Sequence, residues 1–198
     1  GISPLLKTRD YVIPIDFLDK NVDRISNIPL EYLADPSHAL CRFTPPFDET
    51  LRSLLVDETR TVIRESSELS DIDVIDGGVV LQSRFGRFET VAEINAYRGE
   101  GADLITHNLT TEIIFAKQLG IHFAALNIIS NPAEGVAPWS FESLGDIYLA
   151  LNPVTWQILE RVLPRIAAVP SDAPRTIDAQ REHPPISYIE LKKAQQTH

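Results

Sequence analysis

Apolar and polar positions alternate in short blocks that predict strands and helices in turn. Residues 10–18 (DYVIPIDFL) are rich in β-branched and aromatic side chains and predict a strand that Pro14 interrupts. After a turn-rich segment over 19–46, Asp48 is placed to cap a helix. The apolar face of that helix would consist of Leu51, Leu54, Leu55 and Val62.

Three more strands are predicted in the second half of the chain. They are expected over residues 74–83, 103–108 and 122–130. The last is a nearly continuous apolar run, which is typical of a strand buried on both faces. Strands that alternate with helices predict an α/β fold with a largely parallel sheet flanked by helices.

Two helices are predicted between these strands. Thr90 and Glu93 have the spacing of a capping box, which would start a helix that stops at Gly99. A second helix is expected from Thr110 or Thr111 to Leu119, where the following glycine would end it.

The C-terminal part is expected to hold a loop, one helix and a tail. A loop is predicted over 131–151, after which Asn152 and Pro153 form a typical N-cap and first residue of a helix. Its apolar stripe would be Val154, Ile158, Leu159, Val162 and Ile166, and we expect Trp156 to lie in the core. Residues 1–170 would then form one domain. Residues 171–198 are proline-rich and polar and predict a tail that is disordered or lies on a partner.

Composition narrows the class of partner. The formal net charge of −10 and the pI near 4.9 oppose binding to nucleic acid, whereas a small anion such as phosphate needs only a few local donors. Cys41 is the single cysteine, so no disulfide forms within the chain. No apolar run is long enough for a membrane span, and no signal-peptide pattern opens the chain. We therefore expect a soluble cytoplasmic protein.

Common catalytic signatures are absent from the sequence. It has no nucleophile elbow, no P-loop and no helical histidine pair at metal-ligand spacing, so no metal or organic cofactor is expected. The informative stretch is instead GRFETVAE over 86–93. It is preceded by GGVVL over 77–81 and followed by GAD over 101–103, by Glu112 and by Ser130-Asn131.

This series of motifs resembles the trimeric purine nucleoside phosphorylases and methylthioadenosine phosphorylases. In that family a glycine-rich strand leads into a G-P-x-F-E-T-x-A-E turn and helix, followed by G-A-D. The DYVIPIDF segment near the start is similar to the family's D-x-V-I-P-x-D-x-F segment. The resemblance covers residues 8 to 170 in order and implies the C-terminal portion of a phosphorylase-type fold.

The resemblance implies a purine site built from few side chains. Phe88 would pack on the face of the base, Glu89 would bind its pyrimidine edge, and Asn131 would face N7 and the exocyclic atom at position 6. Glu89 and Asn131 would be the catalytic pair, because donors aimed at the charge that develops on the departing base stabilise the transition state. This pair is the family's pattern for 6-oxopurines, and phosphate would be the co-substrate.

The sugar and phosphate side departs from the family. His107 stands where the family has the methionine against the ribose, and Asn108 stands where a serine or threonine touches phosphate. The family's phosphate loop and its Arg/His segment lie upstream of the DYVIP strand. We therefore expect the sheet to be incomplete without an N-terminal half, which a second polypeptide would supply in a trimer-based oligomer.

Other interpretations of these residues stay open. A catalytically diverged subunit that binds a nucleoside or serves as a scaffold is the main alternative, and a hydrolase or nucleoside-forming enzyme is a third. Glu89 could be a carboxylate that favours a helix start, and Asn131 before a proline could be a turn residue. His107 could be a satisfied polar residue, a partner of a sugar hydroxyl or a general acid. Trp139 and Phe141 would cover the pocket or contact a subunit.

Overall fold

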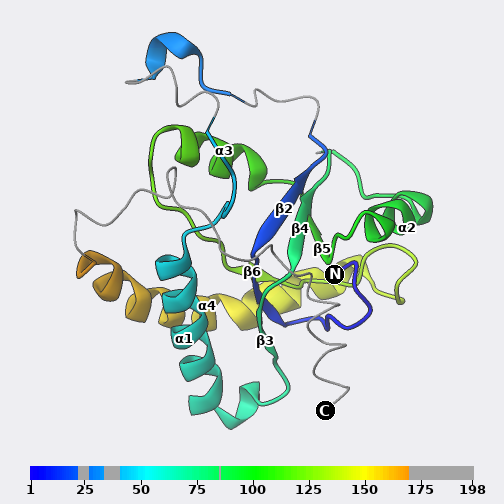
Figure 1. Ribbon diagram of the computed structural model, residues 1–198. Coiled ribbons are helices and arrows are strands. Elements are labelled where there is room, and N and C mark those ends of the chain that lie inside the picture. The colour runs from blue at the N-terminus through cyan, green and yellow to red at the C-terminus, as the bar shows by residue number, and fades with distance from the viewer. Residues whose placement is uncertain (22–26, 34–40, 85, 170–198) are drawn as a thin grey trace, which may run out of the picture.

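The strands lie at the centre of the molecule with helices around them (Figure 1). The computed structural model describes residues 1–21, 27–33, 41–84 and 86–169. Within these ranges the strands are β1 (Tyr11–Ile13), β2 (Asp16–Asp19), β3 (Val74–Asp76), β4 (Val79–Gln82), β5 (Leu104–Thr106) and β6 (Asn127–Ile128). The helices are α1 (Glu49–Glu65), α2 (Val91–Gly99), α3 (Thr110–Gln118) and α4 (Phe141–Ala167), with short 3-10 turns η1 (Leu30–Tyr32) and η3 (Ser67–Leu69).

The described strands form two three-stranded sheets, in the orders β3-β1-β6 and β2-β4-β5. The pairs β1–β3, β2–β4 and β4–β5 are parallel, and β1–β6 is antiparallel. The predicted α/β fold with largely parallel strands and flanking helices is therefore confirmed, with the strands divided between two sheets.

Two segments of the chain, β1–β2 and β3–β4, each pass from the first sheet into the second. Pro14 separates β1 from β2, as predicted, because proline has no N–H for the ladder. Gly77 and Gly78, with φ of +146° and +96°, separate β3 from β4. The Gly77 amide still donates to the Ile13 carbonyl over 3.0 Å, so the two crossing points lie side by side. The strand predicted over 74–83 is thus two strands.

Arg52 of α1 holds this crossing point. Its side chain is 6% exposed, and Nε donates to the Pro14 carbonyl over 2.8 Å. Nη2 donates to the Ile13 carbonyl over 3.3 Å and also to the carboxylate of Asp76 at the end of β3. One buried guanidinium therefore binds both segments where they leave the first sheet.

The helix starts agree with the sequence, but the buried face of α1 is rotated. Asp48 Oδ1 accepts from the Leu51 amide over 2.8 Å, and Thr90 with Glu93 forms the predicted capping box of α2. Leu51 and Leu54 of the predicted apolar face are only partly buried. The apolar residues that α1 buries are Leu55, Val56, Val62 and Ile63.

The strand predicted over 122–130 is mostly absent. Only Asn127–Ile128 pairs, as the edge strand β6 beside β1, and most of the segment is partly buried rather than enclosed. An apolar run cannot by itself distinguish a central strand from an extended segment packed at a sheet edge.

The last helix begins much earlier than predicted. Ser140 caps α4, accepting from the Ser143 amide over 3.4 Å, so the predicted loop over 131–151 ends there. Pro153 and Pro164 lie inside the helix on its exposed side, where water can bind the carbonyls that lose a helical partner. The helix buries Leu151, Val154, Ile158 and Val162 against the core.

The expectation that Trp156 belongs to the core is wrong, since the residue is 64% exposed on the outer face of α4. Of the predicted stripe, Leu159 is partly buried and Ile166 is exposed. The predicted tail over 171–198 lies outside the described residues. No helix in the described part of the chain combines the length and the apolar character that crossing a membrane requires.

Candidate functional site

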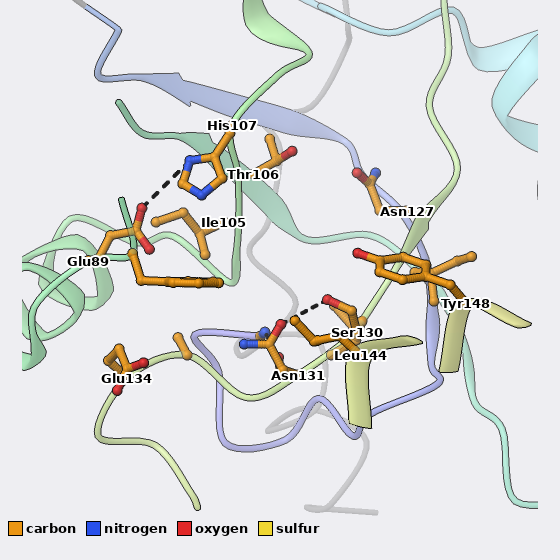
Figure 2. A pocket seen from close by; sticks show the side chains of 15 residues that line it. Glu89, Ile105, Thr106, His107, Asn127, Ser130, Asn131, Glu134, Leu144 and Tyr148 are labelled. Atoms are coloured by element: carbon orange, nitrogen blue, oxygen red, sulfur yellow. Dashed lines mark hydrogen bonds and ion pairs between the residues drawn. The ribbon is translucent and has the colours of Figure 1, made fainter. Parts of the chain in front are cut away.

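A cavity of about 300 Å³ lies where β5 and β6 end, beside the start of α4 (Figure 2). Phe88, Glu89, His107 and Asn131, four of the five predicted site residues, line this cavity. Its remaining wall is partly apolar, with Ile105, Ile128, Ile129, Ala133 and Leu144, and partly polar, with Asn127, Ser130, Glu134 and Tyr148.

The local structure explains why these four side chains meet. Phe88 and Glu89 directly precede Thr90, the N-cap of α2, and His107 directly follows the last residue of β5. Asn131 lies in the segment that leaves β6. Because β4 and β5 are parallel, the segments after them emerge at one sheet edge, which is where ligands bind in open α/β folds.

Ser83 connects Glu89 with His107. The residue follows β4 and is 3% exposed, and its hydroxyl donates to Glu89 Oε1. The Ser83 hydroxyl oxygen also lies 3.1 Å from His107 Nδ1, and this Nδ1 lies 3.9 Å from Glu89 Oε1. Glu89 is itself 9% exposed and has no hydrogen bond to Oε2 from the described residues. The second carboxylate oxygen is therefore left for a ligand in the cavity.

Asn131 is held by its immediate neighbours. Oδ1 accepts from the Ser130 hydroxyl over 2.8 Å, and Nδ2 donates to the Pro132 carbonyl over 2.9 Å. A carboxamide nitrogen carries two hydrogens, so Nδ2 has one further N–H to give. Figure 2 shows the Asn131 side chain across the cavity from His107.

Asn108, the fifth predicted site residue, does not line the cavity. Its Oδ1 accepts from the Thr106 hydroxyl over 2.7 Å, and its amide lies 3.4 Å from the same oxygen. These contacts turn the side chain back toward the end of β5, and Thr106 rather than Asn108 contributes to the cavity wall.

An aromatic cluster extends the wall at Phe88, which is 44% exposed. Its ring centroid lies 5.2 Å from Trp139, 6.1 Å from Phe141 and 6.4 Å from His107. Trp139 and Phe141 do not line the cavity itself; they are the outer neighbours of Phe88, Trp139 just before α4 and Phe141 as its first residue. A half-exposed ring supported on its flanks can serve as a stacking surface.

The cavity lining described here contains carboxylates but no lysine or arginine. Glu89 and Glu134 supply negative charge. The Gly1 nitrogen donates to the Asn131 carbonyl over 2.6 Å. The carboxylates of Glu89 and Glu134 make the described lining more suitable for a neutral polar ligand than for a free anion.

Basic residues gather on the other side of Glu89. A smaller hollow of about 110 Å³ is lined in part by Lys20, Arg84 and Arg87. Lys20 pairs with Glu100 over 2.7 Å, and Arg87 pairs with Glu93 over 2.6 Å. These ion pairs offset much of the positive charge. Across the described residues, no group of three or more histidine, cysteine or acidic side chains has the arrangement of a metal site.

Sequence reasoning missed Ser83 and the residues of α4. A serine at the end of a strand has no motif of its own, and its role follows only from the approach of Glu89 and His107. Leu144 and Tyr148 belong to the predicted loop over 131–151, so their contribution to the cavity depends on the earlier start of α4.

Residues 1–163 match the phosphorylase superfamily, and the chain belongs to this family. A probable S-methyl-5′-thioinosine phosphorylase from Xylella fastidiosa is 28% identical over 147 residues, which cover 74% of this chain and 55% of that protein. A probable 6-oxopurine nucleoside phosphorylase from Korarchaeum cryptofilum is 32% identical over 191 residues, which cover 93% of this chain and 65% of that protein. The resemblance to the purine nucleoside and methylthioadenosine phosphorylases is therefore confirmed.

A solved structure shows the same fold. A point mutant of the adenosine/methylthioadenosine phosphorylase from Schistosoma mansoni, in complex with methylthioadenosine, superimposes with a TM-score of 0.68 at 18% identity. The similarity covers 86% of this chain and 62% of that protein. The chain thus spans between 55% and 65% of the length of these relatives.

Proposed function

We propose that this chain forms the base-binding part of a purine nucleoside phosphorylase-like pentosyltransferase. The enzyme would cleave or form the N-glycosidic bond of a purine nucleoside or thionucleoside with phosphate. The observation that carries this proposal is that three groups line the same cavity: the buried carboxylate of Glu89, the carboxamide of Asn131 and the aromatic ring of Phe88. A flat heterocycle with polar edges matches all three groups.

The chemistry assigns each group a task. When the C1′–N9 bond breaks, its electron pair stays on the purine and a phosphate oxygen bonds to C1′. The remaining N–H of Asn131 would donate to the base as negative charge develops on it, and Glu89 Oε2 would accept from a ring N–H. Phe88 would hold the ring in plane. A purine with an oxo group at position 6 offers the N–H that Glu89 needs, which favours inosine or guanosine.

The groups of the protein that bind phosphate would come from outside residues 1–198. The described lining of the cavity offers phosphate no lysine or arginine, and the basic residues beyond Glu89 are largely paired with carboxylates. We propose that a second polypeptide, or another part of a longer protein, supplies this half of the site within a trimer-based oligomer.

A second candidate is a diverged subunit that binds a nucleoside without catalysis. The support for it is the altered sugar and phosphate side, where Asn108 is turned back onto Thr106. Under this alternative the base pocket would keep its affinity while the reaction is lost.

The test uses the chain purified from its source together with any protein that copurifies. Release of free base from inosine, guanosine and methylthioadenosine is measured with and without phosphate, and inosine binding is measured by calorimetry. We expect phosphate-dependent release of hypoxanthine, with kcat/KM lowered about 100-fold in both Glu89→Gln and Asn131→Ala.

Glu68→Gln is the matched control, because this carboxylate is exposed on η3 and lies outside the cavity lining. It should leave the activity unchanged. Binding of inosine without release, in a complex that contains the second polypeptide, would favour the diverged subunit. If the complex neither binds inosine nor releases base, both candidates are overturned.

A further inference from the structure

Ser83 occupies a position between two polar groups of the cavity. Its hydroxyl oxygen contacts Glu89 Oε1 on one side and His107 Nδ1, over 3.1 Å, on the other. The residue is 3% exposed, so water does not compete freely for either contact. The two contacts are therefore best satisfied by the protein groups themselves.

The number of hydrogens fixes the direction of both bonds. An ionised carboxylate can only accept, and a serine hydroxyl has a single hydrogen. That hydrogen goes to Glu89, so the Ser83 oxygen must accept from His107. A neutral imidazole carries one N–H, which therefore lies on Nδ1, and Nε2 keeps its lone pair.

Nε2 lies on the far side of the imidazole from Ser83. The His107 side chain is 35% exposed and lines the cavity, and Figure 2 shows its second ring nitrogen turned toward the cavity interior. An Nε2 lone pair at this place adds a hydrogen-bond acceptor to a wall that already holds Glu89.

We propose that Ser83 is a positioning residue that fixes His107 as its Nδ1–H tautomer, and that the Nε2 acceptor thereby selects a ligand with a hydroxyl group at this place. The inference rests on the proposed function for its ligand class: with the base edge between Glu89 and Asn131, the group that reaches His107 is a hydroxyl of an unmodified pentosyl sugar. The opposite tautomer would present an N–H, which could donate to a hydroxyl or an ether oxygen and more weakly to a thioether sulfur, so it would not require a hydroxyl there.

The tautomer is measured directly by ¹⁵N NMR of the full chain labelled at histidine, at pH 8. Protonated and bare ring nitrogens differ strongly in ¹⁵N shift. The His107 signals are assigned among the five histidines by their loss in His107→Gln. We expect a protonated Nδ1 in the wild type, a shift toward the Nε2–H form in Ser83→Ala, and retention of the Nδ1–H form in Ser83→Thr.

Ser130→Ala is the matched control, because this serine lines the same cavity but donates to Asn131. It should leave the His107 tautomer unchanged. A wild-type spectrum with Nε2–H overturns the proposal without any variant, which covers the case that Ser83→Ala does not fold. An unchanged tautomer in folded Ser83→Ala overturns it as well.

The ligand class is tested by binding of inosine, 2′-deoxyinosine and 3′-deoxyinosine. Loss of the hydroxyl that reaches Nε2 should weaken binding to the wild type about three- to tenfold, and Ser83→Ala should reduce that ratio toward one. 5′-Deoxyinosine completes the series, and equal affinities for all four nucleosides in the wild type would reject the ligand assignment. Failure of inosine itself to bind would contradict the proposed function, while the NMR result would still decide the role of Ser83.

Discussion

The carboxylate of Glu89 and the carboxamide of Asn131 line one cavity, although α2, β5, α3 and β6 lie between them in the sequence. Each is held by local contacts: Ser83 binds Glu89, and the Ser130 hydroxyl binds Asn131. Their distance from each other is set by the strands that carry them. Mutations in the supporting structure should therefore affect stability, whereas mutations in the cavity wall should affect ligand binding.

Phe88 should contribute to ligand binding more than to folding. The ring is 44% exposed, so Phe88→Leu removes little buried contact but removes the stacking surface. We expect purine nucleoside affinity to fall about tenfold, since aromatic pairs contribute roughly 1 kcal/mol beyond burial. Calorimetry measures the affinity, and urea unfolding should show a change of less than about 1 kcal/mol. Leu149→Ala, another exposed apolar change but on α4, should alter neither.

Arg52 should be important for stability. In Arg52→Met the Ile13 and Pro14 carbonyls and the Asp76 carboxylate lose a buried partner, which should lower the free energy of unfolding by about 3 kcal/mol. Urea denaturation followed by circular dichroism gives the value. Arg64→Met on the exposed side of the same helix is the control, and a similar loss in both variants would contradict the role of Arg52 at the crossing point.

Glu93 should make the start of α2 sensitive to acid. Hydrogen bonds from Arg87 and from the Thr90 amide lower the pKa of Glu93 to about 2. Since the folded pKa lies below the unfolded value of roughly 4.3, its stabilising contribution is present above about pH 4 and is lost as the pH falls toward 2. NMR titration of the Glu93 carboxyl carbon measures this directly.

Arg87→Gln removes the largest cause of that shift, so the pKa of Glu93 should rise toward its ordinary range. Glu93→Gln should flatten the dependence of unfolding on pH between about pH 4 and pH 2. A Glu93 pKa that stays near 2 in Arg87→Gln would show that the capping box alone is responsible.

Gly135 connects the segment beside the cavity with the start of α2. Its φ is +76°, and a Cβ at this residue would meet Val91 Cγ1 at 2.7 Å. Gly135→Ala should therefore lower the free energy of unfolding by about 2 kcal/mol, through both the left-handed backbone and the overlap. Because Glu134 lines the cavity, ligand affinity should fall too.

Two further variants separate these causes. Adding Val91→Ala should recover only the part due to overlap, because the backbone strain remains. Gly99→Ala, where a Cβ meets nothing within 4 Å at the end of α2, should be neutral or slightly stabilising. If Gly135→Ala and Gly99→Ala change the free energy of unfolding equally, the overlap with Val91 is excluded as a cause of destabilisation.

Local signals predicted the parts of the fold that depend on few neighbours. Asp48 and the pair Thr90 and Glu93 start helices as expected, because capping satisfies amide groups within one turn. Pro14 divides its strand for a similarly local reason. The predictions failed where distant packing decides: β6 is an edge strand over Asn127–Ile128, and α4 continues through Pro153 because that residue faces solvent.

The sequence alone determined the family and most of the candidate site residues that line the cavity. The FETVAE block and the residues spaced after it carry chemical information in their order, which survives without coordinates. Folding in three dimensions determined which of these groups share a cavity. Asn108 turns away while Ser83 lies between Glu89 and His107, because the direction of a side chain depends on partners from other strands rather than on its neighbours in the chain.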